Sequence, residues 1–397
     1  MPDKLLIWLS LASLYLIPPL GGADFALRPI YGFYLCLPFF YAKQQAVNFL
    51  AYYLLFMISV LFSIVYGWAF LRVEVVLSDV IELFKLMLPW LAFLFGYLLF
   101  DKYNKKYVEK LAYLAIIFVS IVCLQFSKIY NGLFSRVYAA DSQLPAALGV
   151  DTDYMRIVGV SGNPNDAGML FFFLQLFFLF SYLKNKSGVV AFSWFGSVLS
   201  LILTQSKTAY AALVFSLIVS SIINGKNRIM LGGGALAVLA YLLYSNEIVY
   251  VHNFLTAVQD EGLFSANVFA IRFENASTAL SLWQESKLLG WGVAKSIHPS
   301  VVDVEYFLLL RRYGMIGVLF LMVFMASMVW QSLPGLKSDD DSVNISASFI
   351  FVGTFSILIF MLSNNFFSAY YNQYFYFMML GVFACAARSV ERTGRAN

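Results

Sequence analysis

Long apolar runs alternate with short polar segments along the whole chain. The runs are roughly 17–25 residues long, which is the length that a helix needs to cross a hydrocarbon core of ~30 Å. A membrane barrel would instead show alternating segments of about ten residues, and runs such as FFFLQLFFLF do not alternate. Because lipid accepts only helices and closed barrels, the pattern predicts an all-α polytopic membrane protein.

We expect about twelve transmembrane helices, within a single transmembrane domain that spans residues 1–397. The expected spans lie near 5–20, 28–42, 48–70, 79–100, 110–128, 167–183, 188–204, 208–224, 228–244, 309–331, 345–363 and 370–388. Two long polar intervals, 128–166 and 245–308, remain between them, and the second holds both histidines of the chain. No cleavage site of small residues follows the first run, so we interpret it as a spanning helix and not as a removed signal.

The polar segments fall into two sets that differ in their basic residues. One set carries Lys4, Lys43, Lys102, Lys105, Lys106, Lys110, Lys184, Lys186, Lys226, Arg228, Lys337, Arg388, Arg392 and Arg395, whereas the short segments of the other set carry only Arg28, Arg72 and Lys207. Basic residues concentrate in the cytoplasmic loops of membrane proteins. We therefore expect the N- and C-termini in the cytoplasm, and both long intervals as periplasmic loops that carry the site.

Composition agrees with a membrane protein and argues against other classes. The chain is 61% hydrophobic and 12% charged, with a mean hydropathy of +0.77, whereas soluble chains have about 25% charged residues. The net charge of +4 is scattered over short segments, so we expect no nucleic acid as a partner. The three cysteines lie in apolar runs without metal-ligand spacing, and we expect neither a metal nor a cofactor.

Several arginines in or beside the outer loops are candidates for binding an anionic substrate. They are Arg136, Arg156, Arg272, Arg311 and Arg312. Positive charge on this side runs against the charge bias of the loops, and charge in apolar surroundings at membrane depth is costly and usually retained for a site. The planar guanidinium fork also suits a diphosphate. The alternative is that each arginine is solvated or extends to the lipid headgroups.

A candidate general base lies near the end of the second outer loop. His298, Asp303 and Glu305 fall within eight residues, and each could take a proton from an attacking hydroxyl. The two carboxylates also open a helix, where they stabilise the helix dipole, so capping is the alternative. The spans themselves are nearly free of charge, with Glu82 and Lys85 as the main exceptions.

Four motifs follow one another between residues 156 and 317. They are Arg156-Ile157-Val158-Gly159 with Gly162-Asn163-Pro164-Asn165; Gln205-Ser206-Lys207-Thr208-Ala209; Arg272, Trp283 and Leu289-Gly290-Trp291-Gly292; and Asp303-Val304-Glu305-Tyr306 with Gly314 and Gly317. Each motif alone is weak. In this order and on the expected outer face, the set resembles the O-antigen polymerase (Wzy) and O-antigen ligase superfamily of bacterial envelope glycosyltransferases.

The resemblance implies a GT-C-like membrane glycosyltransferase of the bacterial inner membrane, with its active site on the periplasmic side. The donor would be a glycan on undecaprenyl diphosphate, and membrane lipid and a chain-length regulator protein are further candidate partners. Diphosphate and glycan would be bound by Arg156, Arg136, Arg272, Asn163, Asn165, Lys207, Trp291, Arg311 and Arg312, with Arg272 and one of the three candidate bases in catalytic roles. We expect metal-independent, inverting transfer, because arginines can stabilise the leaving group.

One departure from the family pattern bears on the reaction. Where ligases have His-Asn, this chain has Asp303-Val304, and its histidine lies five residues earlier. This favours a polymerase of O-antigen or a related polysaccharide over a ligase that transfers the glycan to lipid A core. A lipid-linked oligosaccharide flippase or other transporter is the alternative from another class, although transporters usually carry their polar residues near the bilayer midplane.

Overall fold

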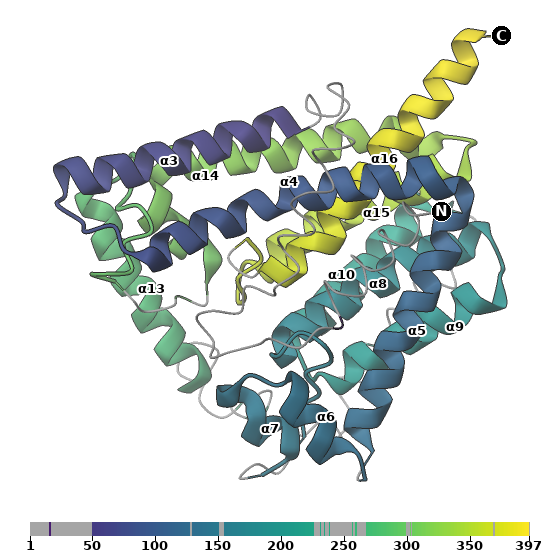
Figure 1. Ribbon diagram of the computed structural model, residues 1–397, viewed down its shortest axis with the longest axis horizontal. Helices are drawn as coiled ribbons and strands as arrows, with labels where there is room; N and C mark the ends of the chain where they lie inside the picture. The colour runs from purple at the N-terminus through teal and green to yellow at the C-terminus, as the bar shows by residue number, and fades with distance from the viewer. Residues whose placement is uncertain are drawn as a thin grey trace.

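The computed structural model describes residues 16, 50–127, 129–150, 155–225, 231, 234, 238, 256, 259, 267–298, 302, 304–367 and 370–396. Within these residues the regular secondary structure is helical and no β-strand occurs, so the all-α prediction is confirmed for this part of the chain (Figure 1). The expected spans at 5–20 and 28–42, and most of the span at 228–244, lie outside the described residues.

Helices occupy the other expected spans. They are α3 (Ala51–Phe70), α4 (Leu77–Tyr103), α5 (Tyr107–Phe126), α8 (Pro164–Lys184), α9 (Gly188–Leu203), α10 (Lys207–Ile223), α14 (Glu305–Ser332), α15 (Asp341–Phe360) and α16 (Tyr370–Ala396). Five stretches of the described chain are long and apolar enough to cross a membrane, namely Ala51–Phe70, Leu77–Phe126, Pro164–Lys184, Glu305–Lys337 and Asp341–Phe360. This is the helix content of a polytopic membrane protein, and the total of twelve spans stays a prediction.

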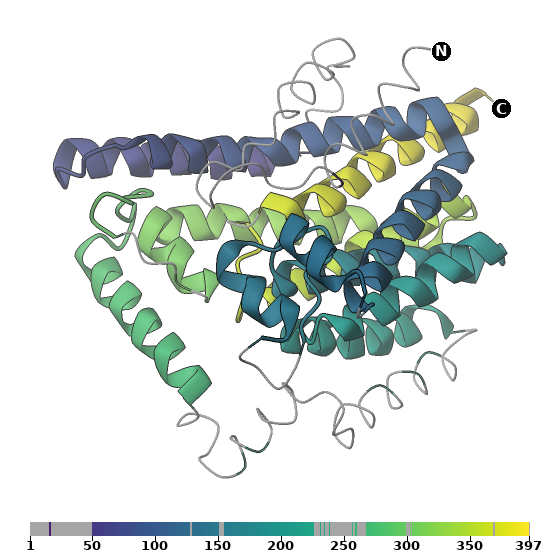
Figure 2. The same cartoon turned by 60° about the horizontal axis from the view of Figure 1, so that its bottom comes forward.

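The two expected outer loops also contain helices. The first holds α6 (Asn131–Tyr138) and α7 (Leu144–Leu148), and the second holds α13 (Asn267–Glu285). Helix α14 begins at Glu305, a full turn before the expected span at 309–331. Helix α13 packs against α14 and extends away from the rest of the molecule (Figure 2).

The apolar stretch Leu77–Phe126 is two helices and not one. A straight helix of that length would far exceed a ~30 Å hydrocarbon core at 1.5 Å per residue. Asn104 breaks it with a left-handed φ of 47°, and its Oδ1 accepts a hydrogen bond from the Lys105 backbone N–H at 2.7 Å. With a ψ of −139°, Asn104 lies outside both helical regions, so α4 cannot continue through it. The chain therefore turns sharply between α4 and α5 (Figure 1).

Close backbone packing joins α4 to α16, while α3 runs beside α14 (Figure 1). A Cβ on Gly96 of α4 would lie 1.7 Å from the Met378 carbonyl oxygen, and a Cβ on Gly381 of α16 would lie 1.9 Å from that of Phe93. Small residues at helix interfaces in membranes allow this approach. The two glycines therefore set the distance between α4 and α16.

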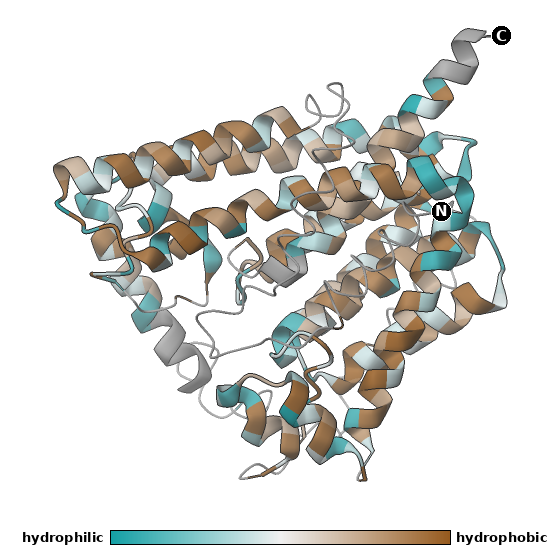
Figure 3. Ribbon diagram, in the orientation of Figure 1, coloured by the Kyte–Doolittle hydropathy of each residue, from teal (hydrophilic) through white to brown (hydrophobic). Residues whose placement is uncertain are grey.

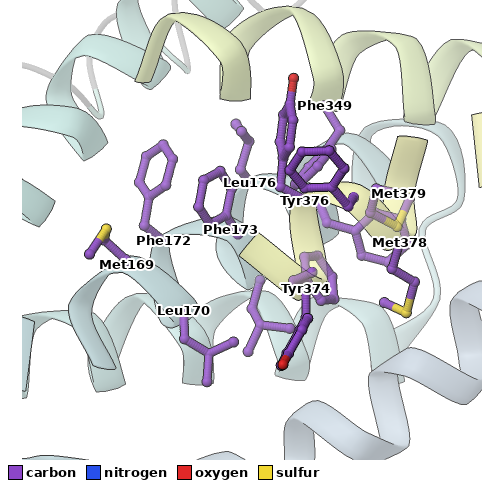
Figure 4. Close-up of a cluster of buried hydrophobic side chains, with 14 of the residues drawn as sticks. Met169, Leu170, Phe172, Phe173, Leu176, Phe349, Tyr374, Tyr376, Met378 and Met379 are labelled. Carbon is purple, nitrogen blue, oxygen red and sulfur yellow. The ribbon is translucent and has the colours of Figure 1, made fainter. Parts of the chain in front are cut away.

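An aromatic cluster surrounds α8 and holds its position (Figure 4). The ring of Phe173 lies 5.8–6.2 Å, between centroids, from the rings of Phe349, Phe360, Phe366 and Tyr376. Such tilted aromatic pairs contribute more than their buried area alone. Because α15 and α16 supply most of these partners, the start of α8 is fixed relative to the turn between those two helices.

The described connections separate into two ends of the molecule. At one end Lys105 Nζ lies 3.4 Å from Asp340 Oδ2, which joins the α4–α5 turn to the α14–α15 connection. Hydrophilic residues gather there (Figure 3). The other end carries α6, α7 and α13. This division matches the two sets of expected loops, and the assignment of the basic end to the cytoplasm stays a prediction of the charge bias.

The Gly96 contact gives a test of the packing. Gly96→Ala should force α4 and α16 apart and lower the thermal unfolding midpoint in detergent, with a cost of about 1–3 kcal/mol as for other overpacked interfaces. Gly132→Ala is the matched control, since a Cβ on Gly132 of α6 would meet nothing within 4 Å. Equal midpoints for both variants would contradict the packing described here.

Candidate functional site

Arg156 is buried at the outer end of α8, where the first two motifs meet. Its side chain is 8% exposed, and its Nη2 donates to Asn165 Oδ1 at 3.0 Å while its Nε donates to the Thr204 carbonyl oxygen at 3.3 Å. Asn163 caps α8 by accepting the Asn165 backbone N–H at 2.8 Å. Arg156, Asn163 and Asn165 therefore lie together, and their role in binding substrate stays a prediction.

The segment that carries Arg156 is clamped from both sides. Gln125 of α5, fully buried, donates to the Gly159 carbonyl oxygen at 2.8 Å and accepts the Gly159 N–H at 2.9 Å. On the other side Gln205 donates to the Met155 carbonyl oxygen at 3.1 Å. Gln125 was not predicted as a site residue, although a single amide near the end of an apolar helix indicates a buried polar contact. The two glutamines fix the backbone beside Arg156.

The expected substrate-binding residues Arg136 and Lys207 lie in different surroundings from Arg156. Arg136 is exposed on α6. Lys207 is the first residue of α10 and is half-buried, one turn from the Thr204 carbonyl that Arg156 contacts. A role for Arg136 in binding therefore stays a prediction.

The Gly290-Trp291-Gly292 motif pairs with the backbone of α14. The Trp291 N–H donates to the Arg311 carbonyl oxygen at 2.9 Å, and the Gly292 N–H donates to that of Arg312 at 2.8 Å. Gly290 and Gly314 have left-handed φ of 71° and 61°, and a Cβ on Gly314 would lie 2.2 Å from the Leu288 carbonyl oxygen. The glycines are required here because the loop passes directly over the α14 backbone.

A buried carboxylate on α4 joins this loop to α14. Glu82, 6% exposed, accepts from Lys295 Nζ at 2.8 Å and from Lys85 Nζ at 2.9 Å, and its Oε2 lies 3.7 Å from Arg312 Nη1. Asp79 of the same helix accepts the Lys295 backbone N–H at 3.0 Å. Glu82, one of the two main charged residues within the expected spans, thus anchors the second outer loop to α4.

His298 lies against Trp291 at the end of this loop. The two rings meet edge to face with centroids 5.3 Å apart. The backbone N–H of His298 donates to the Ala294 carbonyl oxygen at 2.8 Å. Its Nε2 is buried and has no hydrogen-bond partner among the described residues. Burial lowers the pKa of His298, and nearby Arg311 lowers it further, while Glu285 acts in the opposite direction. The imidazole is therefore neutral at pH 7 and able to accept a proton.

The other candidate base in the described chain, Glu305, has a structural contact. It is fully buried at the start of α14, and its Oε2 accepts the Phe366 backbone N–H at 2.7 Å. Asp303 lies outside the described residues. Arg272 lies in α13, and its side chain is also outside the description. The catalytic roles of these residues stay predictions.

The turn between α15 and α16, residues 361–367, links the two halves of the site. Ser363 forms a hydrogen bond with Thr208 of the second motif, and the Met361 carbonyl oxygen accepts the Glu305 N–H at 3.0 Å. Asn364 is 8% exposed, and its Nδ2 has no partner among the described residues. No residue of this turn was predicted for the site, because the segment carries no motif and lies at the boundary between two expected spans.

Comparison with known families matches this region. Residues 191–306 fit the model of the family described as O-Antigen ligase. This part of the chain is therefore similar to the O-antigen ligase family. The matched residues include α9, α10, α13 and the start of α14, whereas the Arg156 segment precedes them. No curated protein is similar enough to this chain to count as a match.

The environment of His298 predicts a pH dependence. In a His252→Gln variant, which leaves one histidine, the NMR signal of His298 should titrate below the ordinary value of about 6.5. The unfolded state binds the proton more readily than the folded state does. Well above pH 6.5 the imidazole therefore contributes no pH dependence to the free energy of unfolding. As the pH falls through 6.5 towards the folded-state pKa, protonation of the unfolded state lowers that free energy. Glu285→Gln should lower the pKa further, and Arg311→Gln should raise it. A midpoint above 6.5 would contradict the burial.

Proposed function

We propose that the protein polymerises undecaprenyl-diphosphate-linked oligosaccharide repeat units into O-antigen or a related surface polysaccharide. A hydroxyl of the acceptor unit attacks the anomeric carbon of the donor glycan. The new C–O bond forms from the side opposite the leaving group, the bond to the diphosphate breaks, and undecaprenyl diphosphate leaves with the electron pair. The hydroxyl proton passes to a base and then to solvent. The configuration at the anomeric carbon is inverted.

The buried guanidinium of Arg156 carries this proposal. It is held by Asn165 and by the Thr204 carbonyl, so its position does not depend on substrate. Fixed positive charge in a low-dielectric site stabilises a developing anion more than mobile charge in water does. The site lies on the expected periplasmic face of the inner membrane, where lipid-linked donors are the plausible substrates. Arg272 would complete the diphosphate site from α13.

Among the three candidate bases, the surroundings of His298 favour it. Its imidazole is neutral at pH 7, and its Nε2 has no protein partner in the described chain. Glu305 already accepts a backbone N–H from Phe366, which suits an anchor better than a proton acceptor. The ring of Trp291 beside the imidazole offers an apolar face on which a sugar can stack.

Ligation to lipid A core is the second candidate function. The family description, O-Antigen ligase, favours it. The Asp303-Val304 pair favours the polymerase, because ligases carry His-Asn at that place in the motif. The two reactions share the donor and the leaving group and differ in the acceptor. A product analysis in cells therefore separates them.

Arg156→Ala and Arg272→Ala should each abolish long polysaccharide chains in a strain that makes a surface polysaccharide. Loss of one stabilising group of this kind lowers rates by about 10²–10³-fold. Gel analysis should show single repeat units still attached to core if the protein is the polymerase, and no attached units if it is the ligase. Lys287→Ala, which removes an exposed cation of the second outer loop, is the matched control. Unchanged chain lengths in both arginine variants would refute these roles.

We also propose that the transfer requires no metal ion, since arginines neutralise the diphosphate. Polymerisation by the purified protein should continue at an unchanged rate in excess EDTA. The measurement is the chain-length distribution over time, with and without chelator. Restoration of a lost activity by added magnesium would overturn the proposal, because it would assign the charge stabilisation to a metal.

A further inference from the structure

Several charged side chains gather around the start of α14. Glu82 alone is approached by three cations, which are Lys85, Lys295 and Arg312. The second carboxylate of the group, Asp79, accepts the backbone N–H groups of Val76 and Lys295. Arg311 is a fourth basic side chain of this group, while Glu305 and Glu285 are further carboxylates nearby, of which Glu305 accepts the Phe366 backbone N–H.

The two arginines of this group are buried and incompletely paired. Arg311 is 2% exposed and Arg312 is 5% exposed. The Nη2 of Arg311 and the Nε of Arg312 are buried and have no hydrogen-bond partner among the described residues. Arg311 also forms no salt bridge with a described carboxylate. Arg312 is paired with Glu82 through Nη1, but a buried donor that lacks a hydrogen bond is costly, so the unpaired nitrogens of the two arginines are suited to an anionic ligand.

Contacts to the main-chain carbonyls fix the backbone of α14 at the two arginines. The Arg312 carbonyl oxygen accepts from Ser63 Oγ at 2.6 Å and from the Gly292 N–H, and that of Arg311 accepts from the Trp291 N–H. The arginines are therefore fixed to α3 and to the Gly290–Gly292 loop. Neighbouring His298 is neutral at pH 7 and adds a further Nε2 without a described partner. The arrangement is a built site and not a pair of solvated charges.

This group is separate from the Arg156 group in its elements. Arg156 contacts residues of α8 and of the α9–α10 turn, whereas the second group joins α3, α4, α14 and the 286–298 loop. The two are linked through the turn at 361–367. The protein thus has two fixed guanidinium centres at one end of its helices.

We propose that Arg311 and Arg312 form a second binding site for a lipid-borne phosphate, and that it holds the diphosphate of the acceptor substrate. The assignment to the acceptor rests on the proposed function, since a polymerase joins two lipid diphosphates and Arg156 serves the donor. The guanidinium forks bind the phosphate oxygens. The acceptor glycan is then positioned towards the donor across the 361–367 turn.

The test compares two acceptors in purified protein with the same lipid-linked donor. One acceptor is a repeat unit on prenyl diphosphate, and the other is the same unit as a neutral alkyl glycoside. Arg311→Gln should lower kcat/KM for the diphosphate acceptor by about 10–100-fold relative to its effect on the alkyl glycoside, which is the range for a charged hydrogen bond. Arg156→Gln should lower both. Lys287→Gln, an exposed cation of the same loop, should alter neither.

Each other outcome counts against the site. An equal loss for both acceptors in Arg311→Gln would indicate a structural role, and no loss for either would refute the assignment. Activity with the alkyl glycoside shows that the variant is folded. Arg311→Lys keeps the charge and loses the fork, so it should show an intermediate loss for the diphosphate acceptor only.

A binding measurement separates this inference from the proposed function. Undecaprenyl diphosphate and phosphatidylglycerol are titrated into wild-type protein and Arg311→Gln in neutral-lipid nanodiscs. Selective loss of undecaprenyl diphosphate binding supports the site, even if wild-type protein transfers to neither acceptor and the polymerase proposal fails. Equal loss of both lipids would identify a general headgroup site and overturn the acceptor assignment. No loss of either would remove the phosphate site altogether.

Discussion

A single buried carboxylate, Glu82, determines how the second outer loop meets the helices. It receives Lys295 from the loop, Lys85 from its own helix and Arg312 from α14. Burying one carboxylate is costly and becomes tolerable only with close partners. Because those partners come from three elements, the charge interaction fixes the loop, and with it Trp291 and His298, to the helix bundle. Loss of Glu82 would leave three cations near the membrane without their shared partner.

The turn at 361–367 gives the two halves of the site a common support. It contacts Thr208 on one side and Glu305 on the other, while Phe366 packs on Phe173 of α8. Helix α8 carries the Asn165 that holds Arg156. The spacing between the two arginine centres therefore depends on aromatic packing in the helix core. Polar groups at this end of the helices are thus positioned by apolar contacts in the helix core.

Sequence reasoning predicted the helices well and the site in part. Apolar length located the described helices among the expected spans, because burial in lipid constrains every residue of a helix. The motif containing Arg156 and Asn165 was found because its turn residues are local signals. Glu82 and the 361–367 turn could not be assigned, since their partners lie 213 and 61 residues away in sequence. Spacing along the chain carries no information about such contacts.

The glycines of the 286–298 loop and of α14 show that the positions of Arg311 and Arg312 depend on close backbone packing. Gly290 lies so close to α14 that a Cβ would meet the Arg312 carbonyl oxygen at 2.6 Å. This contact aligns the loop N–H groups with the carbonyls of both arginines. Electrostatic stabilisation is strongest when the charges are placed before the substrate binds, because no energy is then needed to reorient them. The glycines are thus part of the charge arrangement, although they carry no charge themselves.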